Sequence, residues 1–285
     1  MIPSIPMSAP RQRLYKLYVL AFLIFLVLPL AVVVGFSFND SLFPALPWQG
    51  FTLDWYFGTQ SPKLGLFHDK ILLESIGNSA FIALWVTVVA LALALCNALL
   101  FVRYQFRGKD FLYVLMLLPL VIPGVILGVS ILVSSSQFAN YIEEAFAYDI
   151  EWLRPGATLI VLGQVAFITT ICSLVLIARL RKFDPSLEEA ALNLGASPWV
   201  AFLTVTVPFL RTTIVSAGIV SFLMSFENFN TTLMLVGSDA PLTIAMFQRL
   251  REGSTPVLNS VSVMLMLVSA LLAVISVTFQ KKEKA

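Results

Sequence analysis

The stretch SIGNSAFIALWVTVVALALALCNALLFV, Ser75–Val102, runs for 28 residues without a charged side chain. A helix needs about 20 mainly apolar residues to cross the hydrocarbon layer of a membrane. Runs of this length favour helices over the strands of a closed barrel, the other structure that satisfies the backbone in lipid. The sequence therefore predicts an all-α, polytopic membrane helix bundle with six transmembrane helices. The other five predicted spans are Leu17–Phe38, Phe111–Val133, Ala157–Ala178, Thr212–Val236 and Val257–Phe279.

The loops between these spans are too short for independent domains, so we expect one transmembrane domain over residues 1–285. Of the 285 residues, 59% are apolar and 12% charged, whereas a soluble domain has about 45–50% and about 25%. A formal net charge of +2 provides no basic field for nucleic acid. One histidine, His68, and two cysteines are too few for a His/Cys metal cluster or a disulfide framework. Cys96 and Cys172, both within spans, are expected to be small apolar packing residues.

Basic residues predict the orientation, because loops rich in Lys and Arg stay in the cytoplasm. Five of the 18 cations fall in the first, third and fifth loops: Lys63, Lys70, Arg154, Arg249 and Arg251. We therefore expect both termini in the cytoplasm. The first apolar run of 22 residues exceeds the roughly 7–15 of a signal peptide, so it is expected to be an uncleaved helix. The other 13 cations are Arg11, Arg13, Lys16, Arg103, Arg107, Lys109, Arg179, Arg181, Lys182, Arg211, Lys281, Lys282 and Lys284.

The third predicted span contains two prolines, Pro119 and Pro123, and a pair of glycines four residues apart, Gly124 and Gly128. One interpretation is a kinked helix that lines a transport pathway. The other, which the commonness of the motif favours, is close helix packing through glycine with a bend at proline.

A polar patch, Ser225–Thr232, interrupts the fifth span. On a continuous helix, Glu227 would share a face with Asn230 and Thr231, with Asn228 on the adjoining strip. A central acidic residue costs about 2.5–3.5 kcal/mol to insert in lipid, which disfavours a lipid-facing position. We interpret Glu227, Asn228, Asn230 and Thr231 as candidates for a solvated substrate pathway that favours a cation. The alternative is a hydrogen bond from a protonated Glu227 to a neighbouring helix.

The longest cytoplasmic loop, Arg179–Arg211, predicts two short helices. Asp184-Pro185 and Ser197-Pro198 each combine a capping side chain with a proline at the first helical position. Gly195 can close the first helix in a left-handed conformation. Glu188 and Glu189 fall near its start, where the helix dipole favours anions. Leu187, Ala191 and Leu194 form an apolar stripe along this helix. One interpretation is therefore an amphipathic hairpin that lies on the lipid headgroups.

The letters of this loop support a second interpretation. The loop contains Glu189-Ala190-Ala191, then Gly195 after three further residues, and then Val205-Thr-Val207-Pro208 after nine more. This pattern resembles the EAA loop of bacterial ABC importer permeases, with Val205 and Val207 in place of Ile and Leu. The resemblance extends from about Ser75 to Phe279 as a type I permease core with an extra first helix. Within that family, the chain looks most like the spermidine/putrescine-type permeases. This likeness rests on the outer-loop segment Trp48–Tyr56, the polar patch and the overall length.

The resemblance implies a multi-pass subunit of the bacterial inner membrane that forms half of a translocation pathway. Its expected partners are a second, non-identical permease, two ATP-binding subunits, an extracytoplasmic solute-binding protein and membrane lipid. Because the chain lacks a G-x-x-x-x-G-K-[ST] phosphate loop, ATP and Mg would bind the ATPase partner, and no catalytic residue is expected here. The residues implied in ATPase coupling are Leu187, Glu189, Ala190, Ala191, Leu194, Gly195 and Pro208.

Other functions remain open at this stage. Related permeases carry opines, iron or oxyanions. An ion-coupled secondary transporter would use buried acids or internal repeats, but one acid lies in a span and the halves show no convincing repeat. A membrane enzyme would need a constellation of reactive groups, and the lone His68 beside Asp69 in an outer loop does not supply it.

Overall fold

The computed structural model of the protein describes residues 9–253 and 255–282, and in this part of the chain it contains helices and no strand. Six of the described helices are long and apolar enough to cross a membrane, which confirms the predicted helix bundle. Lys284, one of the cations used for the orientation, lies outside the described residues. The elements are α1 Ala9–Phe36, α2 Asp54–Phe57, η1 Leu66–His68, α3 Lys70–Arg103, α4 Lys109–Val121, α5 Gly124–Phe146, η2 Glu151–Leu153, α6 Ala157–Leu180, α7 Ser186–Asn193, α8 Pro198–Ala201, η3 Phe202–Thr206, α9 Val207–Phe226, α10 Asn230–Leu235, α11 Leu242–Glu252 and α12 Val257–Lys282.

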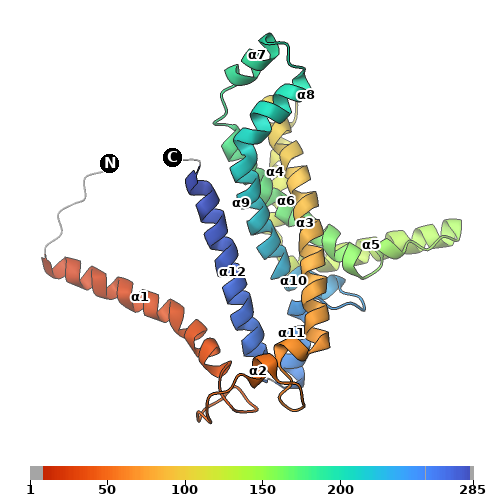
Figure 1. Ribbon diagram of the computed structural model, residues 1–285. Coiled ribbons are helices and arrows are strands. Elements are labelled where there is room, and N and C mark those ends of the chain that lie inside the picture. Colours follow the sequence, from red (N-terminus) through yellow and green to blue (C-terminus); the bar gives the residue numbers. More distant parts are fainter. Residues whose placement is uncertain (1–8, 254, 283–285) are drawn as a thin grey trace. The chain divides into compact units, whose positions relative to one another are not determined.

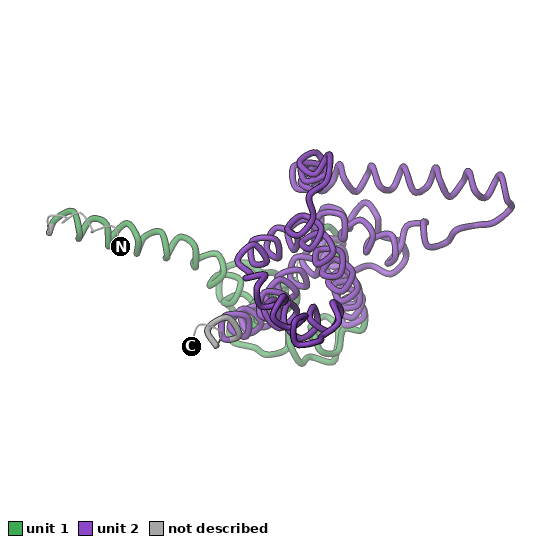
Figure 2. Tube along the Cα trace, turned by 90° about the horizontal axis from the view of Figure 1, so that it is seen from above, with its two compact units in different colours: residues 1–70, 249–267 green, residues 71–248, 268–285 purple. Residues whose placement is uncertain are grey.

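The chain forms two compact units (Figure 2): residues 1–70 with 249–267, and residues 71–248 with 268–285. The first unit holds the loop that follows α1. Its centre is Trp55, whose Nε1 donates a hydrogen bond to the Asn39 carbonyl over 2.9 Å and whose own carbonyl accepts from Ser260 Oγ over 2.9 Å. Arg249 pairs with the buried carboxylate of Asp69 over 2.6 Å. The prediction of one transmembrane domain concerns the whole bundle in its membrane, and it stays a prediction.

The second unit is built around α6, the most buried of the candidate spans. Small side chains on one face of α3, Ala90, Ala94 and Ala98, are fully buried in the same core as Ile168 and Leu176 of α6. Small residues let helix backbones approach closely, which matters where lipid is as apolar as the core. Cys172 is buried in this core as predicted, but Cys96 is exposed, so its predicted packing role is wrong.

The third predicted span is two helices rather than one kinked helix. Helix α4 ends at Val121 and α5 begins at Gly124. Ile122 is extended between them because the residue before a proline is pushed out of the helical region. Helix α5 then leaves the direction of α4 and extends away from α3, α6 and α9 (Figures 1 and 2). At 23 residues, α5 alone is long enough to be a candidate span.

The fifth predicted span is also interrupted, so its predicted continuous polar face is wrong. Helix α9 ends at Phe226, Glu227 is its C-cap, and α10 begins at Asn230. The Asn228 side chain explains the break, because its Oδ1 accepts hydrogen bonds from the backbone N and the Oγ1 of Thr232 over 3.2 and 3.0 Å. Asparagine offers the backbone such local alternatives to a helix.

Pro208 lies inside a long helical segment and does not stand before the start of a span. A candidate span runs from Pro198 to Phe226 through α8, η3 and α9. The segment η3 immediately before α9 is π-helical, and Pro208 is the second residue of α9. Because proline lacks an N–H, it cannot make the usual bond to the carbonyl four residues earlier, and a π-turn is one local adjustment to that loss.

Candidate functional site

The loop Arg179–Arg211, predicted to be cytoplasmic, begins with a capped helix. Helix α7 starts at Ser186, whose backbone N donates to Asp184 Oδ1 over 3.0 Å. This backbone hydrogen bond, together with one from the Ser186 side chain, holds the pKa of the Asp184 carboxyl below its usual range. Pro185 therefore occupies the N-cap rather than the predicted first helical position, and Glu188 and Glu189 lie in the first turn as predicted.

Gly195 ends α7 in the predicted left-handed conformation, with φ at +89°. Ala196 N donates to the Ala191 carbonyl over 3.1 Å, and Gly195 N donates to the Leu192 carbonyl over 2.9 Å, the two bonds of a Schellman motif. The second helix begins at Pro198 with Ser197 as its cap, and Ser197 Oγ accepts from Val200 N over 3.3 Å. The first predicted short helix is thus confirmed, and the second begins where predicted, but it continues without a break into η3 and α9 instead of ending as a short helix.

The apolar side chains of this helix pair are largely uncovered by the described chain. Leu194 is 89% exposed and Leu187 51%, while Ala191 is partly buried. Figure 1 shows α7 and α8 at one end of the second unit, beyond the ends of α3, α6 and α9. The predicted apolar stripe covers only part of this surface, although the apolar run after Ser197-Pro198 is a signal of the rest. The additional exposed residues are Leu192, Trp199, Val200 and Leu203.

Three polar side chains attach α7 to the rest of the second unit. Arg103, the last residue of α3, pairs with Glu188 Oε1 over 2.7 Å and donates to Thr206 Oγ1 over 3.0 Å. The Thr206 hydroxyl also donates to Glu188 Oε1, and Thr206 is fully buried. Glu188 lies at the helix start as predicted, but the sequence carries no signal of its partners, which lie 85 and 18 residues away.

The two helix breaks meet at a cavity of about 280 Å³. Three of the four predicted pathway residues, Asn228, Asn230 and Thr231, line this cavity, whereas Glu227 is exposed and does not. The structure therefore brings together three of the four candidates, through the break and not along one helical face. The remaining lining residues are Pro119, Leu120, Ile122, Gly124, Leu127, Phe167, Ile171 and Met224.

A chain of hydrogen bonds holds the interrupted segment against α6. Gln164 Nε2 donates to Thr232 Oγ1 over 2.9 Å, and Thr232 Oγ1 donates to Asn228 Oδ1. Ser225 Oγ donates to Gln164 Oε1, so the ends of α9 and α10 are tied to one buried amide. Buried polar groups are costly without partners, and this chain satisfies them where the helix is broken.

Glycines allow α10 to lie close to α5 and α6. A Cβ atom on Gly124 would lie 3.2 Å from Asn230 Cβ, and one on Gly128 would lie 3.0 Å from Met234 Cβ. A Cβ atom on Gly163 would collide with Leu235 Cδ1. The favoured interpretation of Gly124 and Gly128 as packing residues is confirmed, with α10 as the partner. Proline and glycine nevertheless also border the cavity, because Pro119 and Gly124 are among its lining residues.

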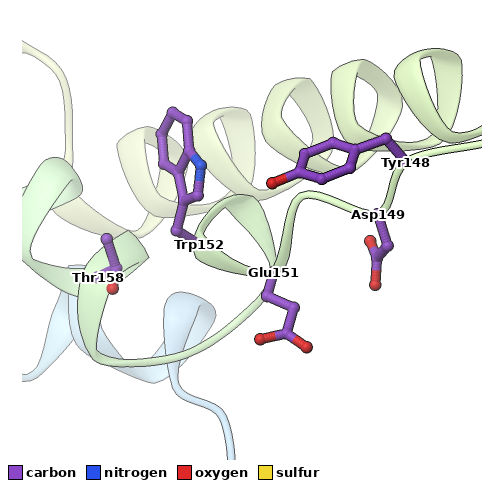
Figure 3. Close-up of a pocket in the computed structure, with 5 residues that line it drawn as sticks. All are labelled: Tyr148, Asp149, Glu151, Trp152 and Thr158. Atoms are coloured by element: carbon purple, nitrogen blue, oxygen red, sulfur yellow. The ribbon is translucent and has the colours of Figure 1, made fainter. Parts of the chain in front are cut away.

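A second cavity of about 580 Å³ lies between the end of α5 and the start of α6, where the charge pattern predicts the outer face. Its lining residues are Tyr148, Asp149, Glu151, Trp152 and Thr158 (Figure 3). Arg154 anchors this loop to α5, pairing with Glu143 over 2.6 Å and with Asp149 over 3.1 Å. The cavity therefore combines aromatic rings with carboxylates, one of which is already paired.

Known proteins resemble this chain in sequence and in fold. The profile of a family described as "binding-protein-dependent transport system inner membrane component" matches residues 87–282. The chain belongs to this family. In this permease component, the interrupted spans and the helices α7 and α8 described above are parts of one chain.

Two relatives of this permease cover most of its length. The putrescine transport system permease protein PotI of Escherichia coli K12 is 30% identical over 245 residues, 85% of this chain and 82% of the relative. The spermidine/putrescine transport system permease protein PotC of Haemophilus influenzae is 25% identical over 259 residues, 90% of this chain and 93% of the relative.

Solved structures confirm the ABC permease fold of the chain. A bacterial ABC transporter involved in the import of the acidic polysaccharide alginate matches with a TM-score of 0.68 and 16% identity, over 96% of this chain and 95% of that one. The alginate transporter in complex with an alginate pentasaccharide-bound periplasmic protein matches with a TM-score of 0.71 and 17% identity, over 93% of both chains.

Proposed function

We propose that this permease imports polyamines, such as putrescine or spermidine, in an ATP-driven complex. The observation that carries the proposal is the similarity to PotI and PotC over more than four fifths of each chain. Polar side chains at the central cavity, Asn228, Asn230 and Thr231, agree with a small hydrogen-bonding solute. Exposed Glu227 beside this cavity agrees with a cation, since an opposite charge attracts it.

The complex would contain partners that supply energy and substrate. In this proposal, the exposed apolar side chains of α7 and α8 dock in a groove of an ATP-binding subunit, as amphipathic helices commonly do. Glu189 would meet a polar group there, and Ala190 and Ala191 would permit close approach. Two such ATPase subunits would bind ATP and Mg, a second, non-identical permease would complete the pathway, and a solute-binding protein would deliver the polyamine. The chain itself would have no catalytic activity.

The termini would lie in the cytoplasm of a bacterium, with the loop between α5 and α6 outside. This orientation is tested with single cysteines in a background where Cys96 and Cys172 are replaced by alanine. We expect Arg107→Cys to be protected from a membrane-impermeant maleimide in intact cells with a permeabilised outer membrane, and Asp149→Cys to react. The reverse labelling pattern would overturn the orientation.

The function is tested with the whole complex, purified gently and reconstituted in liposomes with its binding protein. We expect an ATP-binding subunit to co-purify and labelled putrescine to accumulate when ATP is present on the side of α7. Accumulation that follows an ion gradient without ATP would overturn the ATP-driven mechanism. ATP-dependent uptake of an opine, iron or an oxyanion, with none of putrescine or spermidine, would overturn the substrate class alone.

A further inference from the structure

We propose that Arg103, Glu188 and Thr206 form a clasp that couples α7 to the spans, so that these positioning residues set how much transport each ATP drives. The inference rests on the proposed function, because it assumes that α7 receives the movement of an ATPase. The clasp joins three segments that are distant in the sequence: the end of α3, the first turn of α7 and the last residue of η3.

The geometry of the clasp is closed, since each of its three side chains contacts the other two. Arg103 Nη2 lies 2.7 Å from Glu188 Oε1 and 3.0 Å from Thr206 Oγ1, and the hydroxyl of Thr206 reaches the same Oε1. The side chains of Arg103 and Glu188 are 31% and 20% exposed. An isolated exposed ion pair contributes little, but here Glu188 is partly buried and both charged groups share the hydroxyl of buried Thr206.

A second contact fixes the beginning of the same loop. The Arg179 guanidinium lies 4.1 Å from the centre of the Phe209 ring, and the Phe183 ring meets Phe209 edge-on at 5.2 Å. The loop is therefore attached to the start of α9 at its beginning and to α3 and η3 through α7. Between these attachments and the second helix, Leu194 and Gly195 are exposed. A force on the exposed helix pair thus reaches the spans through two attachments.

The clasp closes at a place where the helical path is irregular. Thr206 is the last residue of the π-helical segment, two residues before Pro208. Irregular turns of this kind are frequent at hinges and functional sites. Because Glu188 bonds Thr206 and Arg103 together, α7 is positioned to move η3 and the end of α3 as one body. Without the clasp, α7 would tilt while the spans stay in place.

The test measures putrescine imported per ATP hydrolysed by the whole complex in liposomes, for Glu188→Gln and Arg103→Gln. We expect the ATPase subunit to remain bound and the ratio to fall about threefold or more in the two charge variants. The exchanged pair, Arg103→Glu with Glu188→Arg, is expected to recover most of the loss. Arg107→Gln is the matched control, because Arg107 is an exposed cation in the loop Tyr104–Gly108, which directly follows α3. The ratio of putrescine to ATP in this variant is expected to equal the wild-type ratio.

Wild-type ratios in both charge variants, or an exchanged pair as poor as the single variants, would overturn the clasp. If the single variants are lost from the membrane, recovery of protein and ratio in the exchanged pair supports the clasp, and continued loss overturns it. Failure of the proposed function is distinguishable, because it appears in the unmodified protein: no ATPase subunit co-purifies, or no ATP-dependent uptake occurs. That result would overturn both inferences.

Discussion

Thr231 Oγ1 donates a hydrogen bond to the Gly124 carbonyl oxygen over 3.3 Å, which joins the first turn of α10 to the first residue of α5. Each of these helices follows a break in a span, at Ile122–Pro123 and at Glu227–Phe229. Non-helical backbone at membrane depth is tolerated where it is buried in protein or lines a water-filled cavity. Residues at the two breaks line one cavity, so substitutions near these breaks are expected to affect the substrate.

Glu227→Gln is expected to weaken uptake of putrescine. Removing the charge of Glu227 costs a cation bound near it about 1 kcal/mol in a solvated environment, so KM for uptake should rise about fivefold while the ATPase subunit stays bound. Initial uptake rates over a range of putrescine concentrations measure this effect. The control is Glu144→Gln, an exposed acid of α5 away from the cavity. Unchanged kinetics in Glu227→Gln would favour a purely structural role for this side chain.

Gly195→Asp is expected to abolish transport and substrate-stimulated ATP hydrolysis while the permease remains in the membrane. The substitution places a side chain on a left-handed residue, at φ +89°, and a charge beside exposed Leu194. Gly108→Asp is a close control, because Gly108 has φ +87° and, like Gly195, open space at its Cβ position. Full transport by Gly195→Asp, or equal loss in Gly108→Asp, would contradict a specific role of the α7–α8 turn.

The sequence predicted the features that depend on local chemistry or on long apolar runs. Six long apolar helices follow from the length of the apolar runs, although the third and fifth predicted spans are each interrupted, and the end of α7 and the start of α8 follow from Gly195 and Ser197-Pro198. Such signals need no knowledge of the partner segment, because the cap or the glycine acts within its own turn. The same local logic explains why the packing role of Gly124 and Gly128 could be anticipated without naming α10.

The sequence could not predict features that depend on contacts between distant segments. Pro119, Pro123 and the polar patch Ser225–Thr232 mark the places of both breaks, but they do not tell whether the helix bends or ends there. The hydrogen bond between Gln164 and Thr232 joins residues 68 positions apart, and the one between Arg103 and Glu188 joins residues 85 positions apart. One sequence alone does not identify such tertiary partners.

Gln164→Leu is expected to destabilise the interrupted segment. The substitution removes the acceptor of the Ser225 hydroxyl and the donor to Thr232 inside the core, and an unsatisfied buried polar group costs about 1–3 kcal/mol. A lower apparent melting temperature in detergent and faster proteolysis near Asn228 would show it. Thr278→Val is the control, since that exposed hydroxyl bonds its own helix. Equal stability of Gln164→Leu and the control would contradict the role of this amide.

Gly163→Ala tests whether α10 packs closely against α6 because Gly163 has no side chain. The new methyl group would collide with Leu235 Cδ1 and lie 3.3 Å from Thr231 Cγ2. Overpacking of this kind costs about 1–3 kcal/mol, so the apparent melting temperature should fall. Because truncating Leu235 removes the colliding atom, Gly163→Ala should cost clearly less in a Leu235→Ala background, a coupling that a double-mutant cycle measures. Gly77→Ala, in α3 with nothing within 4 Å of its Cβ position, should be neutral or slightly stabilising. Additive effects of the two substitutions would mean that α10 does not rest on Gly163, and the seating of the cavity wall on α6 would then need another explanation.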